Sequence, residues 1–260
     1  MYKEKLYSLL MVIVAGGSLR GQPTLIPIQN TFDQLMSSKL YKKGNPLRLH
    51  LGCGQTYFNG YINIDFPPVD HTVQNTSPAD VYGDITKLVF SRNSIDEIRS
   101  HHVFEHFERP IALALLCQWQ QWLKIGGMLV IETPDALGCM KAMSDQELSF
   151  TQKQLVMRHL FGSHEARWAV HCDGWYKEKY EYILQQLGFG QLKIVRQAYK
   201  KELPNITVHA QKVQEYSLDE VLNRAKYILR QSMNGEGGSE EQLYQVWMGS
   251  FNKYLKHRIV

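Results

Sequence analysis

A short apolar strand that leads directly into a glycine turn constrains this chain more than any other feature. Leu47–Leu51 has the character of a buried strand, and Gly52 and Gly54 follow it at once with one residue between them. Glycine lets the backbone turn tightly and lets a ligand approach where a Cβ atom would otherwise stand. The pattern predicts an α/β fold with a nucleotide or nucleoside site at the carboxyl end of this strand.

The residues after the glycines narrow the class of ligand. A dinucleotide fingerprint needs a third glycine where this chain has Tyr57, and no Gly-Lys-Ser/Thr of a P-loop follows. Instead, Asp65 and Asp84 end the next two strands, where carboxylates can accept hydrogen bonds from ribose hydroxyls and from the amine of adenine. Each aspartate could equally be a strand-end cap or a turn residue. Together the residues favour a nucleoside ligand without a pyrophosphate.

Strands and helices alternate along the chain, and this order predicts the fold class. The expected elements are a helix at 31–42, strands at 47–51, 60–65, 81–84 and 95–100, a helix at 110–124, a strand at 128–132, one or two helices within 138–170, a helix at 176–187, strands at 191–196 and 206–213, and helices at 217–233 and 239–256. They predict an α/β, Rossmann-like, mostly parallel seven-stranded sheet with an antiparallel edge strand, followed by C-terminal helices.

Composition supports one globular domain with additions. The chain has 260 residues, 44% of them hydrophobic, and a net charge of +4. Without a basic stripe we expect no nucleic acid partner, and no apolar run is long enough for a transmembrane helix. The cysteines are widely spaced without a C-x-x-C pair, so we expect reduced thiols and neither disulfides nor a zinc site. They are Cys53, Cys117, Cys139 and Cys172.

Consecutive motifs in this chain resemble those of the class I S-adenosylmethionine (SAM)-dependent methyltransferases, most closely the small bacterial-type, methyltransferase-11-like enzymes. The motifs are Leu49–Gly54, Gly60–Asp65, Gly83–Leu88, Ser94–Ile98, His102–His106 and Leu123–Pro134, with His171–Trp175 and Leu187–Phe189 further on. The resemblance implies an N-terminal extension at 1–44, a SAM-dependent methyltransferase domain at 45–213 and a C-terminal helical extension at 214–260. The cofactor it implies is SAM.

The resemblance also implies a set of cofactor contacts. They run from the amino-acid end of SAM through the ribose and the adenine to the point where methyl donor and acceptor meet: Gly52, Cys53 and Gly54, then Asp65, then Asp84 with Ile85, and finally His101 and His102. No pattern of the family matches Cys139, Arg158–His171 or the C-terminal helices, so the sequence leaves the substrate unassigned.

Methyl transfer from a sulfonium is an in-line displacement, in which positioning alone can supply about 7–11 kcal/mol. An oxygen or nitrogen acceptor also benefits from a general base, and histidine has a suitable pKa. We expect His106 and His171 to be the catalytic pair, with Glu105 as an orienting partner or alternative base. Any one of these histidines could instead be structural. The other candidates are His101, His102 and His164.

Histidines spaced four apart can share one helix face and bind a metal, which raises a second interpretation of residues 101–106. The order is not H-E-x-x-H, and the segment leaves a strand rather than beginning as a helix. We therefore predict no metal.

The N-terminus has two interpretations. Lys3 and Lys5 precede the apolar stretch Leu9–Val14 and the small residues Ala15–Gly17, as in a weak secretory signal. The alternative is a strand or helix that packs on the domain. We favour the second because SAM is a cytosolic cofactor, and we expect a cytoplasmic protein with no membrane partner.

The leading functional hypothesis is methyl transfer to a small-molecule or sugar-precursor acceptor. One alternative is an NAD-linked oxidoreductase on the same fold, which Tyr57 opposes. Another is a non-catalytic SAM-fold module whose C-terminal helices bind a partner or form a homodimer. An apolar stripe on the last helix would suit that role, or would pack on its own domain. The stripe comprises Leu243, Trp247, Phe251, Tyr254 and Leu255.

Overall fold

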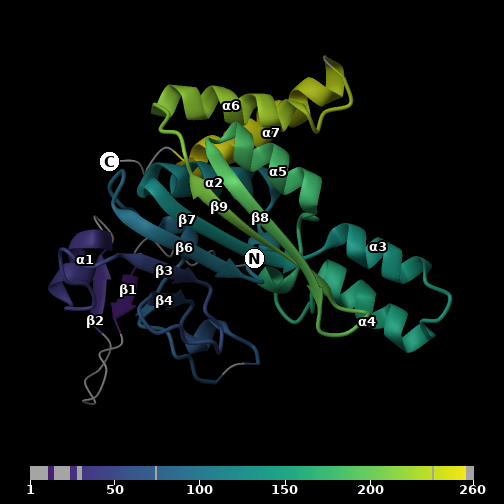
Figure 1. The fold of residues 1–260 in the computed structure, drawn as a ribbon, viewed down its shortest axis with the longest axis horizontal. Helices are drawn as coiled ribbons and strands as arrows, with labels where there is room; N and C mark the ends of the chain where they lie inside the picture. Colours follow the sequence, from purple (N-terminus) through teal and green to yellow (C-terminus); the bar gives the residue numbers. More distant parts are fainter. Residues whose placement is uncertain (1–10, 15–23, 28–30, 74, 236, 256–260) are drawn as a thin grey trace, which may run out of the picture.

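The strands of the described residues form one nine-stranded sheet, and the helices pack around it (Figure 1). The computed structural model describes residues 11–14, 24–27, 31–73, 75–235 and 237–255. The strand order is β2-β1-β5-β4-β3-β6-β7-β9-β8. The strands are β1 (Met11–Val14), β2 (Thr24–Pro27), β3 (Arg48–Leu51), β4 (Ile62–Asp65), β5 (Val81–Tyr82), β6 (Ile95–His101), β7 (Leu123–Pro134), β8 (Phe189–Ala198) and β9 (Pro204–Lys212).

Seven of these strands, β5 to β8 in the spatial order, form the predicted sheet. Strands β5, β4, β3, β6 and β7 are parallel to one another, and β9 pairs antiparallel with both β7 and β8. The mostly parallel Rossmann-like sheet is therefore confirmed. Its antiparallel strand lies one place inside the edge, because β8 and β9 pair as a hairpin and β9 adds next to β7.

The β1–β2 hairpin extends the opposite edge of the sheet. β1 pairs antiparallel with β5 and with β2. β1 comprises the last four residues of the apolar stretch that also resembles a secretory signal, so this part of the stretch is a strand of the sheet. Lys3, Lys5, Leu9, Leu10 and Ala15–Gly17 lie outside the described residues.

Helices α2, α5, α6 and α7 gather on one side of the sheet, while α3 and α4 lie at one end (Figure 1). The α-helices are α1 (Thr31–Ser37), α2 (Arg109–Trp122), α3 (Ala136–Ser144), α4 (Phe150–Phe161), α5 (Lys177–Gln186), α6 (Leu218–Arg230) and α7 (Gly238–Leu255). Short 3-10 turns are η1 (Pro68–Asp70), η2 (Ile85–Lys87), η3 (Phe104–His106) and η4 (Arg167–Ala169). No helix of the described residues is long and apolar enough to span a membrane.

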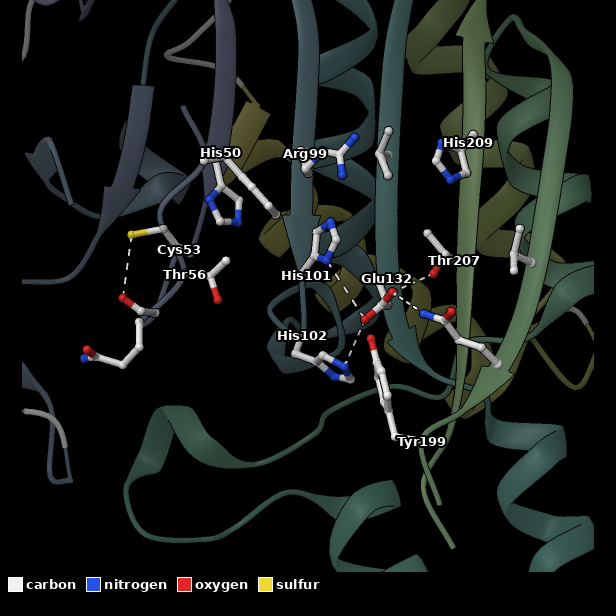
Figure 2. A pocket seen from close by; sticks show the side chains of 17 residues that line it. His50, Cys53, Thr56, Arg99, His101, His102, Glu132, Tyr199, Thr207 and His209 are labelled. Carbon is white, nitrogen blue, oxygen red and sulfur yellow. Dashed lines mark hydrogen bonds and ion pairs between the residues drawn. The ribbon is translucent and has the colours of Figure 1, made fainter. Parts of the chain in front are cut away.

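The two faces of the sheet carry different chemistry, because successive side chains of a strand point to opposite sides. On β7, Ile131 is fully buried in the hydrophobic core, whereas its neighbour Glu132 lines a polar cleft (Figure 2). β6 shows the same division between Ile98 and Arg99. One face therefore holds the molecule together and the other is available to a ligand.

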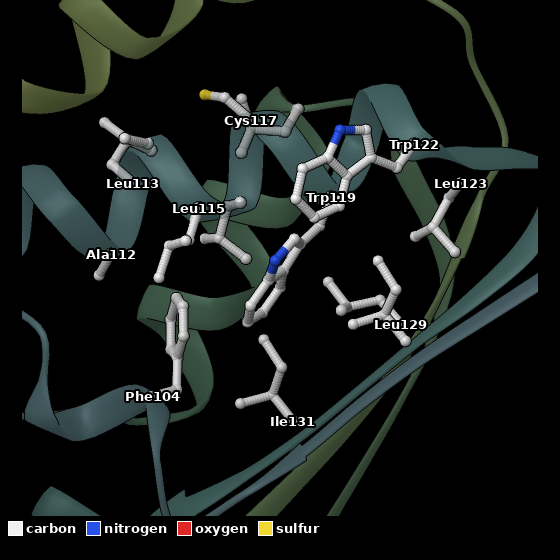
Figure 3. Packing of buried hydrophobic residues seen from close by; sticks show 14 of the residues in the cluster. Phe104, Ala112, Leu113, Leu115, Cys117, Trp119, Trp122, Leu123, Leu129 and Ile131 are labelled. Carbon is white, nitrogen blue, oxygen red and sulfur yellow. The ribbon is translucent and has the colours of Figure 1, made fainter. Parts of the chain in front are cut away.

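The core lies between the sheet and α2 (Figure 3). Pro110 stands in the first turn of α2, where its missing N–H costs no helical hydrogen bond. Trp119 and Trp122 are fully buried among Leu129 and Ile131 of β7. This packing fixes the position of β6 and β7, the two strands whose carboxyl ends form part of the site.

Helix α7 packs on α2 and so belongs to the same core. The expected apolar stripe of this helix is only partly correct: Phe251 and Leu255 are buried, but Leu243 is 39% exposed. Tyr244 and Met248 take the buried positions instead. The stripe is displaced because the buried face follows the contact with α2.

Candidate functional site

Two cavities meet at the carboxyl end of β3, and Gly52, Gly54 and His102 line both of them. The first, here called the edge cavity, has a volume of about 350 Å³. Its walls also include Asp65, Phe66, His71, Gly83, Asp84, Ile85, Thr86, Val103, His106, Phe107, Ile111, Trp168 and Tyr254. The second, here called the face cleft, has a volume of about 740 Å³ and lies over the polar face of the sheet (Figure 2).

The glycine turn has the geometry that its residues predict. Gly52 and Gly54 both have positive φ angles, of 69° and 54°. A Cβ atom on Gly52 would stand 2.1 Å from Cγ2 of Val103, a distance that no side chain tolerates. The N–H of Gly52 donates to the carbonyl of Ile64 at 2.8 Å, which ties the turn to β4. The floor of the edge cavity is therefore bare backbone.

Asp65 stands where a ribose contact is expected. Its side chain is 9% exposed and accepts hydrogen bonds from the N–H of Gly54 and, at 2.7 Å, from the N–H of Phe66. A carboxylate has about four acceptor positions, so lone pairs remain for ribose hydroxyls. Nearby, Nε2 of His71 lies 3.5 Å from Oδ1 of Asp65.

His71 supplies a test of whether a polar ligand fits the edge cavity. Both of its ring nitrogens are buried and make no hydrogen bond to the described residues. A buried polar atom without a partner is costly, and a ligand that brings hydroxyl groups would satisfy it. Trp168 packs edge-on against the His71 ring, with centroids 5.5 Å apart. These residues fit the ribose and adenine of a nucleoside cofactor.

Asp84 has a local structural task. It is the N-cap of η2: Oδ1 accepts from the N–H of Thr86 at 2.9 Å and from its hydroxyl at 2.6 Å, while Oδ2 pairs with Lys87 at 3.2 Å. The cap role that the sequence left open for this aspartate is thus present. Ile85, only 6% exposed, lines the edge cavity beside it. A contact of Asp84 with adenine stays a prediction.

The face cleft is lined by side chains that come from alternate positions of several strands (Figure 2). They include His50 of β3, Arg99 and His101 of β6, Val130 and Glu132 of β7, Val195 and Gln197 of β8, and Thr207 and His209 of β9. The loop that follows the glycine turn adds Gln55, Thr56 and Phe58, and Tyr199 closes the far side. No helical residue of the described ranges lines this cleft.

Glu132 is the anionic centre of the face cleft. Oε2 accepts from the Thr207 hydroxyl at 2.6 Å and from the Gln197 amide at 3.2 Å, and Oε1 lies 3.4 Å from Nε2 of His102. The pKa of Glu132 falls to about 2, chiefly because of His102, with Thr207 adding to the effect. The group is therefore a carboxylate at any physiological pH.

The two adjacent histidines at the end of β6 have opposite charge states. Burial lowers the pKa of His101 to about 4, so its ring is neutral. Burial alone would lower the pKa of His102 as well, but the carboxylates of Glu105 and Glu132 outweigh it and raise the pKa to about 9. A protonated His102 thus stands at the junction of the two cavities, beside a neutral His101.

The other cationic and basic groups of the face cleft are largely neutralised. Arg99 pairs with Glu97 at 3.0 Å and lies over the ring of Phe58, 5.4 Å from its centroid. Burial lowers the pKa of His50 and of His209, which favours their neutral form. The cleft therefore offers mainly neutral hydrogen-bonding groups around one carboxylate.

The structure brings most of the predicted site residues together but divides them between the two cavities. Cys53 and His101, expected as cofactor contacts, line the face cleft rather than the edge cavity. Burial raises the pKa of the Cys53 thiol to about 12, so it is not a nucleophile. His106 lines the edge cavity, while His171 lines neither cavity. These two rings meet edge to face, with centroids 4.6 Å apart.

Sequence reasoning missed several residues of both cavities. His71 directly follows η1 and Trp168 stands in η4, neither within a recognisable motif, and Trp168 reaches the edge cavity from the segment between α4 and α5. The strand residues of the face cleft carried a usable signal. A polar residue such as Glu132 or His209 inside an otherwise apolar strand indicates a face that is not packed in the core.

Comparison with known proteins finds a match for the central part of the chain. Residues 49–131 match the family model of a methyltransferase domain. No curated protein matches the sequence.

Similar solved structures include three methyltransferases. One is a SAM-dependent methyltransferase of Methanosarcina mazei, with 14% identity, 68% of this chain and 97% of that chain covered, and a TM-score of 0.42. Another, from Archaeoglobus fulgidus, has 16% identity, covers 70% and 93%, and has a TM-score of 0.41. The third is the Burkholderia thailandensis 1,6-didemethyltoxoflavin-N1-methyltransferase with S-adenosylhomocysteine bound, at 13% identity, 70% and 76% covered, and a TM-score of 0.43.

Proposed function

We propose that the chain is a class I SAM-dependent methyltransferase that methylates a small, hydroxyl-bearing acceptor, such as a sugar precursor, bound in the face cleft. The edge cavity then holds the cofactor, with Asp65 at the ribose and Ile85 beside the adenine. The observation that carries the proposal is the junction of the two cavities at Gly52, Gly54 and His102.

The chemistry of the face cleft supports an uncharged polar acceptor. Its neutral imidazoles and the carboxylate of Glu132 can exchange hydrogen bonds with hydroxyl groups, and Arg99 is already paired with Glu97. A site for a phosphorylated or nucleic acid substrate would instead present unpaired basic side chains. The cleft also has more than the volume of a single sugar ring.

Two residues of the face cleft are suited to orient and deprotonate the acceptor. Nε2 of His101 is buried, forms no hydrogen bond with the described residues, and belongs to a neutral ring that can take a proton. Glu132 lies 4.0 Å from Nδ1 of His101 and would stabilise the imidazolium that forms. SAM supplies the methyl group from a positively charged sulfur. With the cofactor bound, His101 would accept the hydroxyl proton of the acceptor as the acceptor oxygen takes the methyl group.

The proposed acceptor contacts differ from His106 and His171, the catalytic pair expected from sequence. His106 and His171 lie against Glu105, outside the face cleft, so we assign the acceptor contacts to His101 and Glu132. Substitution within the pair His101 and Glu132 should therefore affect methyl transfer differently from substitution within the pair His106 and His171. Each pair can be changed without altering the other.

The experiment separates cofactor binding from turnover. Purified protein is incubated with methyl-labelled SAM and a fractionated small-molecule extract, labelled products are identified by mass spectrometry, and S-adenosylhomocysteine affinity is measured by calorimetry. We expect Asp65→Ala to weaken binding by about 10- to 100-fold, because it removes a charged hydrogen-bond acceptor. Asp70→Ala is the control, since this exposed carboxylate lies outside both cavities.

Glu132→Gln tests the acceptor half of the proposal. We expect binding of S-adenosylhomocysteine to stay within about threefold of wild type while methyl transfer falls by at least about tenfold. Full turnover in Glu132→Gln would refute the face cleft as the acceptor site. Equal cofactor binding by Asp65→Ala would refute the edge cavity as the cofactor site.

A further inference from the structure

Glu105 is a buried carboxylate that the proposed methyl transfer does not use. It stands in η3, is only 2% exposed, and neither of its oxygens accepts a hydrogen bond from the described residues. The nearest ring nitrogen of His102 lies 3.4 Å from Oε1. The ring of His102 is shared between Glu105 and Glu132, so the carboxylate of Glu105 keeps lone pairs for a further cation.

Two histidines lie close to this carboxylate, and each turns Nδ1 to a backbone carbonyl. Nδ1 of His106 faces the carbonyl of Val170 at 3.2 Å, and Nδ1 of His171 faces the carbonyl of Leu160 at 3.3 Å. A carbonyl can only accept, so each Nδ1 carries the hydrogen and each neutral ring keeps its lone pair on Nε2. Nε2 of His171 lies 3.9 Å from Oε1 of Glu105.

The lone pair of His171 therefore faces an anionic oxygen, and a cation between them would remove the conflict. Glu105, His106 and His171 each offer one ligand atom, and the three atoms lie within 4.8 Å of one another. Ligands bonded to one metal at about 2.0–2.2 Å lie roughly 3–3.5 Å apart, so small side-chain rotations would close the site.

We propose that Glu105, His106 and His171 bind a divalent first-row transition metal ion such as Zn²⁺. Two imidazole nitrogens and one carboxylate oxygen suit these borderline ions, whereas Mg²⁺ and Ca²⁺ prefer oxygen ligands alone. The Nδ1–H groups that donate to backbone carbonyls are the usual second interaction of metal-binding histidines. Glu105 and His106 stand close together in sequence, and His171 joins them from a distant part of the chain.

The ion would also fasten a segment that lines the edge cavity, a role that rests on the proposed function. Residues 162–176 join α4 to α5 and carry both His171 and Trp168. The indole N–H of Trp168 donates to the carbonyl of Asp70 at 3.2 Å, and its ring lines the edge cavity. The metal links this segment to η3, so its removal should weaken cofactor binding. By linkage, cofactor and metal should strengthen each other's binding.

Cobalt titration tests the site directly. Protein stripped of metal with a chelator is titrated with Co²⁺, and the visible absorption of the bound ion is followed; Zn²⁺ affinity is then measured by competition. We expect one equivalent to bind wild type, and at least about 100-fold weaker binding in His171→Ala and in Glu105→Gln, each of which removes a ligand. His164→Asn is the matched control, because His164 is exposed in the same segment and asparagine tolerates its φ of 59°.

Folding and cofactor binding are checked on the same samples by circular dichroism and by S-adenosylhomocysteine titration, and His106→Gln replaces any variant that does not fold. In wild type, metal should raise the affinity for S-adenosylhomocysteine by roughly fivefold or more, and in His171→Ala it should have no effect. If wild type binds neither Co²⁺ nor Zn²⁺ more tightly than His171→Ala does, the cation at this site is a proton and the metal proposal is wrong. Unchanged S-adenosylhomocysteine affinity in the metal-loaded wild type would overturn the fastening role.

Discussion

The two faces of the central sheet are built from the same strands but have different tasks. On β7, Ile131 packs into the core beneath α2, and the next residue, Glu132, stands in the face cleft. On β6 the same step separates Ile98 from Arg99. Of two neighbouring residues in a strand, one is therefore constrained by packing density and the other by charge and hydrogen bonding. Substitutions one position apart should change different properties.

The largest effect is expected on the packed face. Ile131→Ala deletes three buried carbon atoms from a fully buried side chain, and cavities of this kind cost about 3 kcal/mol of unfolding free energy. Urea denaturation followed by circular dichroism measures the loss. The folded fraction should bind S-adenosylhomocysteine normally. A loss below about 1 kcal/mol would show that the division between the two faces is less strict than β7 suggests.

A smaller effect is expected at the glycine turn, where the two cavities meet. Gly52→Ala forces a side chain into a positive φ and against Val103, which together cost about 2 kcal/mol and also fill the floor of the edge cavity. Gly60→Ala has a similar φ of 80°, but its Cβ would meet only Nη1 of Arg48 at 4.0 Å.

Urea denaturation and S-adenosylhomocysteine titration together separate the backbone strain from the steric clash. Gly60→Ala should lose about 1 kcal/mol of stability and no cofactor affinity, whereas Gly52→Ala should lose both. If Gly52→Ala bound S-adenosylhomocysteine like wild type, the turn would not be the floor of the cofactor site.

The smallest effect is a pH dependence that belongs to the polar face. Burial lowers the pKa of His101 from an ordinary value of 6.5 to about 4, so the unfolded chain takes up a proton that the folded chain refuses. The stability contributed by the neutral ring is present above pH 6.5 and is lost as the pH falls toward 4. Between about pH 7 and pH 5.5, wild type should lose about 1 kcal/mol more stability than His101→Asn does. If paired urea titrations showed that wild type and His101→Asn lose the same stability, the His101 ring would be protonated in the folded protein.

The fold and several residues of the edge cavity were predictable from sequence, because each proposed cofactor contact among them follows the end of one strand. Gly52, Gly54, Asp65 and Ile85 sit in short local motifs, and parallel strands bring their carboxyl ends to one edge. The β1–β2 hairpin was not predicted as part of the sheet, since four-residue strands have no distinctive pattern and pair only where an edge is available.

The face cleft and the group of Glu105, His106 and His171 were harder to predict, because both depend on contacts between residues far apart in the chain. Glu132 meets Thr207 only because β9 pairs with β7, and His171 reaches Glu105 only because the segment after α4 folds back on η3. The expected pairing of His106 with His171 is present in space, yet its surroundings are a buried carboxylate rather than the acceptor cleft. Strand pairing and burial decide these roles.

A crystal structure with S-adenosylhomocysteine bound would show whether the two cavities divide cofactor and acceptor between them. We expect the ribose beside Asp65, the adenine beside Ile85, and the sulfur at the junction near His102, directed toward the face cleft. Adenosine found in the face cleft, against Glu132 and His209, would contradict this division.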